Sequence, residues 1–138
     1  MEITTSIVPG KSLGGIFLGE KIDDVIARLS KKYLIEKNLN CTTIDSGLIT
    51  AYHDEEGFIS SLSCNSTFQG TYQDKIWPGM TVADILTNTA SQVAWSGFVQ
   101  VDQMGGAGLS LPNEIDDFER LTDDFADDYV FEELWIYD

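Results

Sequence analysis

The sequence is poor in the residues that carry most enzyme chemistry and metal binding. It contains one histidine, His53, and two cysteines, Cys41 and Cys64. One imidazole and two scattered thiols match no zinc-ligand spacing, and two cysteines are too few for a disulfide scaffold. We therefore predict no catalytic residue, metal or cofactor. We expect both thiols to be reduced and at least half buried, and His53 to be an exposed polar residue.

Basic residues are also scarce. Eight lysines and arginines stand against 23 aspartates and glutamates, which gives a formal net charge of −15. Direct binding to nucleic acid needs basic residues that contact phosphates, so the charge argues against this ligand and against an anionic membrane surface. A strongly basic protein partner fits, because opposite charges accelerate association. The alternative is that the acidity only keeps the protein in solution.

Long apolar runs and nucleotide-binding motifs are missing as well. No run approaches the roughly 18 apolar residues of a membrane helix, and the opening MEITTSIV lacks the basic and apolar regions of a signal peptide. We therefore expect a cytoplasmic protein. The glycines between residues 10 and 19 are too irregular for a phosphate-binding fingerprint, and the acidic residues form no calcium loop. The length of 138 residues predicts a single domain, 1–138.

The sequence does contain a pattern that occurs twice, sixty positions apart. Residues 12–29 and 76–89 each consist of a short apolar run, a glycine turn and a helix-like stretch. Apolar residues in both stretches follow the i, i+3, i+4 spacing of one buried helix face, which includes Ile26 and Leu86. The first helix is predicted over residues 22–32. The second begins after Thr81, where the acid three residues later completes a capping box.

Strand-like segments follow each of these helices. Polar links that contain glycine join them into two predicted hairpins, with strands over 48–52 and 58–64 and over 97–101 and 109–111. These elements predict an α+β fold in which two helices pack on an antiparallel sheet of hairpins. The recurrence indicates two degenerate helix-plus-hairpin repeats, about 10–66 and 70–138.

The end of the chain differs in character from the rest. Residues 114–138 hold eleven acidic residues and one basic residue, so they carry −10 of the net charge of −15. Apolar residues within it recur at intervals of three and four: Ile115, Phe118, Leu121 and Phe125. This spacing predicts a helix over 113–125 with the acids on its opposite face. A final strand is predicted over 129–137, with Trp135 in the core.

Such a concentration of negative charge exceeds what solubility requires and favours an interaction surface. The predicted partner-binding residues are Asp116, Asp117, Glu119, Asp123, Asp124, Asp127 and Asp128. They are suited to lysine and arginine side chains that normally contact phosphate, and the aromatic residues of 129–137 would add anchors. The rival interpretation is a solvated helix face, with the partner contacting the hairpin links 54–56 or 105–108.

One segment resembles a known class of proteins. The stretch VPGKSLGGI at residues 8–16, followed by LGE at 18–20 and IDDV at 22–25, resembles small bacterial immunity proteins of contact-dependent inhibition and other polymorphic toxin systems. The doubled pattern also resembles, more loosely, the tandem units of β-lactamase inhibitor protein and of small outer-membrane assembly lipoproteins. The first resemblance implies a cytoplasmic inhibitor of one cognate toxin C-terminal domain, usually a nuclease. It assigns no role to individual residues.

Charge and resemblance together predict an immunity protein that neutralises a basic nuclease toxin by occluding its substrate-binding site and has no enzymatic activity. Two alternatives belong to other classes. One is a small acidic enzyme or ligand-binding protein that uses a pocket between sheet and helices, and the other is a structural assembly module. A deep apolar pocket with convergent polar groups would favour the enzyme. A neighbouring gene for a large secreted protein with a variable C-terminal domain would favour the inhibitor.

Overall fold

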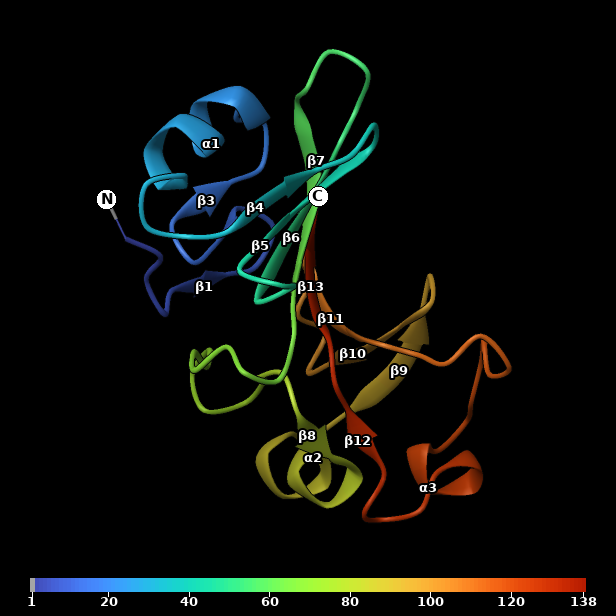
Figure 1. Ribbon diagram of the computed structural model, residues 1–138. Helices are drawn as coiled ribbons and strands as arrows, with labels where there is room; N and C mark the ends of the chain where they lie inside the picture. The colour runs from blue at the N-terminus through green and yellow to red at the C-terminus, as the bar shows by residue number, and fades with distance from the viewer. Residues whose placement is uncertain (1) are drawn as a thin grey trace.

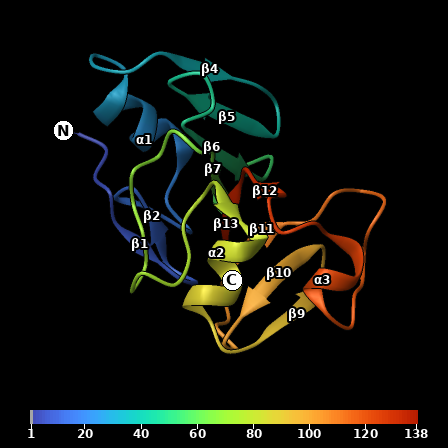
Figure 2. The same cartoon turned by 90° about the horizontal axis from the view of Figure 1, so that it is seen from below.

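Eight antiparallel strands form one large sheet in the computed structural model of the chain, which describes residues 2–138. Their order is β4-β5-β6-β7-β13-β11-β10-β9, so the last strand of the chain lies in the middle of the sheet beside β7 (Figures 1 and 2). The strands are β4 Ile35–Lys37, β5 Cys41–Ile44, β6 Ile49–His53, β7 Ile59–Cys64, β9 Gln92–Trp95, β10 Phe98–Val101, β11 Ala107–Ser110 and β13 Leu134–Tyr137. Each half of the chain thus supplies four adjacent strands.

Two smaller sheets and three helices accompany the large sheet. A three-stranded sheet lies near the start of the chain, and β8 pairs with β12. Their bounds are β1 Ile7–Val8, β2 Ser12–Leu13, β3 Ile16–Phe17, β8 Met80–Thr81, β12 Val130–Phe131, α1 Ile22–Leu29, α2 Val82–Asn88 and α3 Leu121–Asp124. The chain is therefore a mixed α and β protein dominated by antiparallel sheets, as predicted at this level. Its organisation as one domain stays a prediction.

One face of the large sheet, which we call the inner face, carries the apolar core. Its fully buried residues are Ile44, Ile49, Ala51, Leu62, Val99, Val101, Ala107, Leu109, Leu134 and Ile136. They belong to one apolar cluster with buried residues of α1, α2 and β1–β3, and Figure 1 shows α1, β1 and β3 on one side of the sheet. The other face of the sheet is therefore available for contacts that are not part of this core.

Helix α1 buries three of the four residues of its predicted apolar face, and the helix is shorter than expected. Ile22, Val25 and Leu29 are buried, and Ile26 is half-buried. The helix ends at Leu29 and does not reach residue 32. The backbone N–H groups of Lys32 and Tyr33 both donate to the carbonyl of Leu29, so the chain turns there.

Helix α2 begins as predicted, with a reciprocal capping box. The side chain of Thr81 accepts from the N–H of Asp84 at 3.1 Å, and the Asp84 carboxylate accepts from the N–H of Thr81 at 3.0 Å. The prediction that Leu86 is buried is wrong, because its side chain is 42% exposed. The buried face of this short helix is formed by Val82 and Ile85, which leaves Leu86 at its margin.

The predicted helix over 113–125 is wrong, since only the four residues of α3 are helical. The burial pattern that suggested it is nevertheless present, because Phe118, Leu121 and Phe125 are all buried. Aspartate side chains bond to the backbone before α3 and at its start, so the helix begins only at Leu121. The Asp117 carboxylate accepts from the N–H of Phe118 at 2.8 Å, and the Asp123 carboxylate accepts from the N–H of Arg120 at 3.3 Å. The segment is thus an irregular loop with apolar anchors.

The two predicted hairpins exist as β6–β7 and β10–β11. Strand β11 begins at residue 107, so the second link occupies 102–106 and not 105–108. The predicted final strand over 129–137 is divided into β12 and β13. Trp135 lies on β13 between the buried Leu134 and Ile136, but its own side chain is only half-buried and points to the opposite face.

The sulfur and imidazole groups lie in or near the core. Both thiols are free, Cys64 is buried and Cys41 is half-buried, as predicted. Burial raises the pKa of the Cys64 thiol to about 12. The expectation that His53 is exposed is wrong. Its ring ends β6 at 6% exposure, with Nε2 3.0 Å from the hydroxyl of the buried Thr42.

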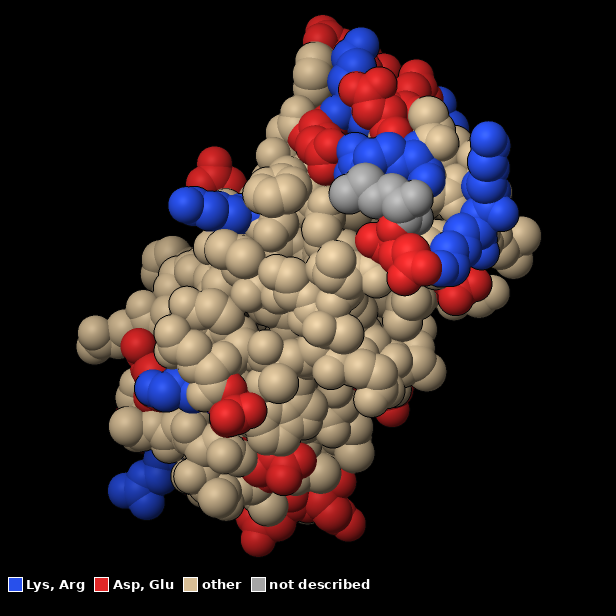
Figure 3. All heavy atoms as spheres, turned by 90° about the vertical axis from the view of Figure 1, so that its left-hand side faces the viewer, with Lys and Arg blue, Asp and Glu red and all other residues tan. Residues whose placement is uncertain are grey.

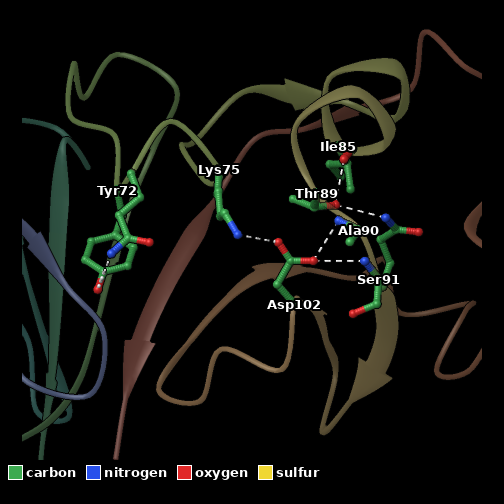
Figure 4. A network of polar contacts seen from close by, with 9 residues as sticks. Tyr72, Lys75, Ile85, Thr89, Ala90, Ser91 and Asp102 are labelled. Carbon is green, nitrogen blue, oxygen red and sulfur yellow. Dashed lines mark hydrogen bonds and ion pairs between the residues drawn. The ribbon is translucent and has the colours of Figure 1, made fainter.

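Asp102 connects the end of α2, the start of β9 and the loop before α2 (Figure 4). Its carboxylate accepts from Lys75 Nζ at 2.9 Å, from the N–H of Ala90 at 2.7 Å and from the N–H of Ser91 at 2.9 Å. The hydrogen bond from Lys75, followed by the one from Ser91, lowers the pKa of Asp102. These bonds fix the β10–β11 turn against the segment that enters β9.

Two neighbouring residues of α2 test this description of the core. Replacing the fully buried Ile85 with alanine should lower the free energy of unfolding by about 2–5 kcal/mol. The same change at the exposed Leu86 should lower it by about 0.5 kcal/mol. Urea unfolding of the two variants measures the difference, and equal losses would contradict the assigned burial.

The Asp102 network predicts a pH dependence of stability. Because the folded-state pKa lies below the unfolded value, the carboxylate stabilises the fold above the unfolded pKa of about 3.9, and this is lost as the pH falls through the folded pKa. Asp102→Asn should therefore cost about 1–3 kcal/mol at pH 7, with a smaller difference from the wild type in acid. Asp74→Asn in the adjacent exposed loop is the control. The free energy of unfolding of the wild type and of the Asp102→Asn variant is measured from pH 7 into acid. A difference between them that stays the same at every pH would contradict the prediction.

Candidate functional site

The face of the large sheet opposite the core, which we call the outer face, carries aromatic side chains among small polar ones. The strand register brings residues from both halves of the chain together on this face. Trp135 of β13 lies opposite Ser63 on one neighbouring strand and Gly108 on the other. Tyr52 and Tyr137 are both paired with Ser61.

Four aromatic rings form a continuous cluster across the middle of this face. Tyr52 stacks on Trp135 with ring centroids 4.7 Å apart, and Phe98 lies 5.7 Å from Trp135. Phe98 also stacks on Tyr137 at 4.9 Å. Serines and glycine on the intervening strands leave room for the rings. A Cβ at Gly108 would lie 2.6 Å from the Cβ of Phe98, so only glycine fits there.

The cluster lies in a partly dehydrated and negatively charged environment. Burial is the main cause that raises the pKa of both Tyr52 and Tyr137, and the negative charge of Glu133 raises that of Tyr52 further. The indole Nε1 of Trp135 donates to the Glu133 carboxylate at 3.4 Å. A carboxylate therefore lies at the edge of the most central ring.

The acidic segment, residues 113–128, begins beside the outer face, where Ile115 and Asp116 lie close to Phe98 and Trp135. All seven residues predicted to bind a partner are exposed: Asp116, Asp117, Glu119, Asp123, Asp124, Asp127 and Asp128. Buried side chains hold the segment in place, and Phe125 contacts both Tyr129 and Phe131 at 4.7 and 5.2 Å between ring centroids. The carboxylates are thus presented to solvent by a segment that is anchored to the core.

The distribution of charge over the molecule is uneven. Figure 3 shows acidic and basic side chains intermixed at the end where α1 lies, whereas acidic side chains predominate at the opposite end. Three of the four ion pairs among the described residues lie at the first end and involve Arg28, Lys32 and Lys37. Arg120 is the one basic residue within the acidic segment.

A hollow of about 300 Å³ joins the acidic segment to the outer face. Phe98 and Trp135 line it from the sheet, and Ile115 and Asp116 line it from the segment. A second hollow of about 240 Å³ lies against Tyr129, Glu132 and Glu133. The two hollows share the wall 110–112, and each combines an aromatic ring with at least one carboxylate. Such an arrangement is suited to cationic side chains.

The surroundings of His53 form a separate hollow, which has no accessible catalytic group among the described residues. The ring borders a hollow of about 210 Å³ with the link 54–57, Asp23 and Lys37. Its two nitrogens lie 3.0 Å from the Thr42 hydroxyl and 3.5 Å from the carbonyl of Asp54. Both nitrogens thus have partners within the chain. The Thr42 hydroxyl is fully buried, so its pair with the imidazole is not accessible to a substrate. Within residues 2–138, no group of three or more histidine, cysteine or acidic residues is arranged to hold a metal.

None of the helices within residues 2–138 has the length and apolar character needed to cross a membrane. The outer face itself was not predicted from the sequence. Its signal is present in β10 and β13, where Phe98 alternates with buried valines and Trp135 alternates with Leu134 and Ile136. When a strand has apolar residues on both faces, either a second element packs on the face opposite the core or that face remains an exposed apolar surface.

Comparison with known proteins identifies no relative. No protein-family model matches the chain, and no match is found among curated proteins or among solved structures.

Two glycines test whether the ring cluster depends on the close contact at Gly108. Gly108→Ala should lower the free energy of unfolding by about 1–3 kcal/mol and change the near-ultraviolet circular dichroism, because Phe98 must move. Gly105→Ala is the matched control, since a Cβ there meets nothing within 4 Å. An unchanged aromatic spectrum in Gly108→Ala would contradict the described packing.

Proposed function

We propose that the chain is an immunity protein that binds and neutralises a cognate, basic toxin domain, most simply a nuclease. The observation that carries the proposal is an exposed acidic segment lying beside an aromatic sheet face. The segment carries −7 of the net charge of −15 in sixteen residues, and its seven candidate carboxylates are exposed. A nuclease binds phosphate through lysine and arginine, so a carboxylate surface complements its substrate-binding site.

The proposed mechanism is occlusion. Exposed carboxylates at the rim accelerate association with a basic surface, and carboxylates that become buried form charge-assisted hydrogen bonds with lysine or arginine. The rings of the outer face would supply the apolar centre of the interface, because tryptophan and tyrosine are enriched among the residues that contribute most of the binding energy. Nucleic acid then has no access to the groups that the inhibitor occupies.

We further propose that the fold consists of two degenerate units. Two pairs of backbone hydrogen bonds support this. Gly19 N–H donates to Ile59 and Gly79 N–H donates to Phe131, at 2.8 and 2.7 Å. Ile22 N–H donates to Gly57 and Val82 N–H donates to Tyr129, at 2.7 and 3.1 Å. Donors sixty positions apart thus make equivalent bonds to the chain that enters β7 or β13.

The sheet order is consistent with the same relation, since β4 to β7 run from one edge to the centre and β9, β10, β11 and β13 run from the other. In this scheme β6 corresponds to β11. The link 54–58 of the first unit then corresponds to residues 111–133 of the second. The acidic segment is then a long insertion in the second unit, at the position where the first unit has a short turn. Insertions in surface loops commonly carry recognition.

The proposal is tested with the C-terminal domain encoded by the neighbouring gene. Three double variants each exchange two aspartates for asparagines: Asp116 with Asp117, Asp123 with Asp124, and Asp127 with Asp128. Asparagine keeps one acceptor oxygen, which is enough for the single backbone bonds of Asp117 and Asp123. We expect slower association and a weaker salt dependence in at least one variant, and a loss of about 2–5 kcal/mol where a carboxylate is buried against the toxin.

The matched control changes Asp24 and Asp74 to asparagine, which removes the same charge from exposed positions outside the segment. Affinity is measured at two salt concentrations after folding is confirmed. If all three variants bind like the wild type and keep its salt slope, the acidic segment is not the interface. If the two proteins do not bind at all, the inhibitor proposal itself fails.

A further inference from the structure

We propose that the hollow between Phe98, Trp135 and Asp116 is a receptor site for one arginine side chain of a protein partner. The inference deepens the proposed function and depends on it for the identity of the partner. The chemistry of recognition is argued from the hollow itself.

The hollow has the size and the walls of a side-chain site. Its volume of about 300 Å³ lies at the lower limit of the roughly 300–1,000 Å³ found for small-ligand pockets. Two aromatic rings from different strands, tilted by 49° to each other, form the side that belongs to the sheet. Leu111 and Pro112 extend this apolar surface, on which the methylene groups of a long side chain can lie.

The charge around the hollow has one sign. Asp116 lines the hollow, and the Glu133 carboxylate, next to the hollow, accepts a hydrogen bond from the indole N–H of Trp135. Asp116 takes part in none of the ion pairs among the described residues. The outward-facing residues of β10, β11 and β13 include no lysine or arginine. A cation that enters the hollow would therefore meet the Asp116 carboxylate, with Glu133 on the far side of the Trp135 indole N–H, and none of the described residues that line the hollow is basic.

Arginine fits this combination better than lysine does. Its planar guanidinium stacks on aromatic faces and bonds to a carboxylate with two parallel N–H groups, whereas an ammonium group is a strongly hydrated point charge. The neighbouring hollow, with Tyr129 and Glu132 across the shared wall 110–112, offers a second site of the same kind. Partners with two or more exposed arginines close together are the expected occupants.

A nuclear magnetic resonance titration tests the inference without the toxin. The ¹⁵N-labelled protein has three indole N–H signals, from Trp77, Trp95 and Trp135, which single Trp→Phe variants assign. The probes are a hexa-arginine peptide and a hexa-lysine peptide. We expect hexa-arginine to shift the Trp135 signal in a saturable manner, to leave Trp77 unchanged, and to bind more tightly than hexa-lysine.

Two variants with the same loss of charge separate a site from general attraction. Asp116→Asn should weaken the affinity for hexa-arginine, measured by the Trp135 signal, about threefold, which lies within the range measured for exposed ion pairs. Asp124→Asn, outside the hollow, should leave it nearly unchanged, and Asp116→Glu should restore most of it. Equal weakening by Asp116→Asn and Asp124→Asn, or a Trp135 signal that does not move, would overturn the inference.

These outcomes are independent of the test of the proposed function. If a toxin domain binds the chain but hexa-arginine does not shift the Trp135 signal, the arginine site is overturned and the inhibitor proposal stays intact. A saturable response of Trp135 to hexa-arginine, in a protein that binds no product of its neighbouring gene, would support the site and overturn the inhibitor proposal.

Discussion

The pairing of β7 with β13 holds the two halves of the chain together. Residues 61–64 pair with residues 134–137, although the whole second half of the chain lies between them. Leu62 and Ile136 face each other across this seam, and both are fully buried. Closing so long a loop costs conformational entropy, which the burial of apolar surface along the seam offsets. A single core can therefore extend across all eight strands.

The same seam assembles the candidate site. Tyr52 comes from the first half of the chain and Phe98 from the second, and both contact Trp135 on the central strand. The chain must also leave the sheet after β11 and return to its middle as β13. The acidic segment belongs to the connection between these two strands, so one topological constraint brings the rings and the start of the segment, with Asp116, together.

Local signals in the sequence predicted local structure well. The capping box at Thr81 starts α2, and the apolar spacing identified the buried Phe118, Leu121 and Phe125. The same spacing did not predict their conformation. The Asp117 carboxylate bonds to the backbone before α3, and the Asp123 carboxylate bonds to the N–H of Arg120 at its start, so the helix begins only at Leu121. The direction of Trp135 was not predictable either. It depends on its register against Ser63 and Gly108, which are distant in the sequence.

The two edges of the large sheet are protected differently. Edge strand β4 carries Glu36 and Lys37, whereas β9 has no charged residue and exposes 47% of Val93 and 58% of Trp95. An uncharged apolar edge is a template for pairing with a second copy. The net charge of −15 opposes such an encounter, but its reach falls to about 8 Å at 0.15 M salt. The acidity proposed for recognition therefore also provides colloidal stability, which concentrated stocks lose when the ionic strength rises.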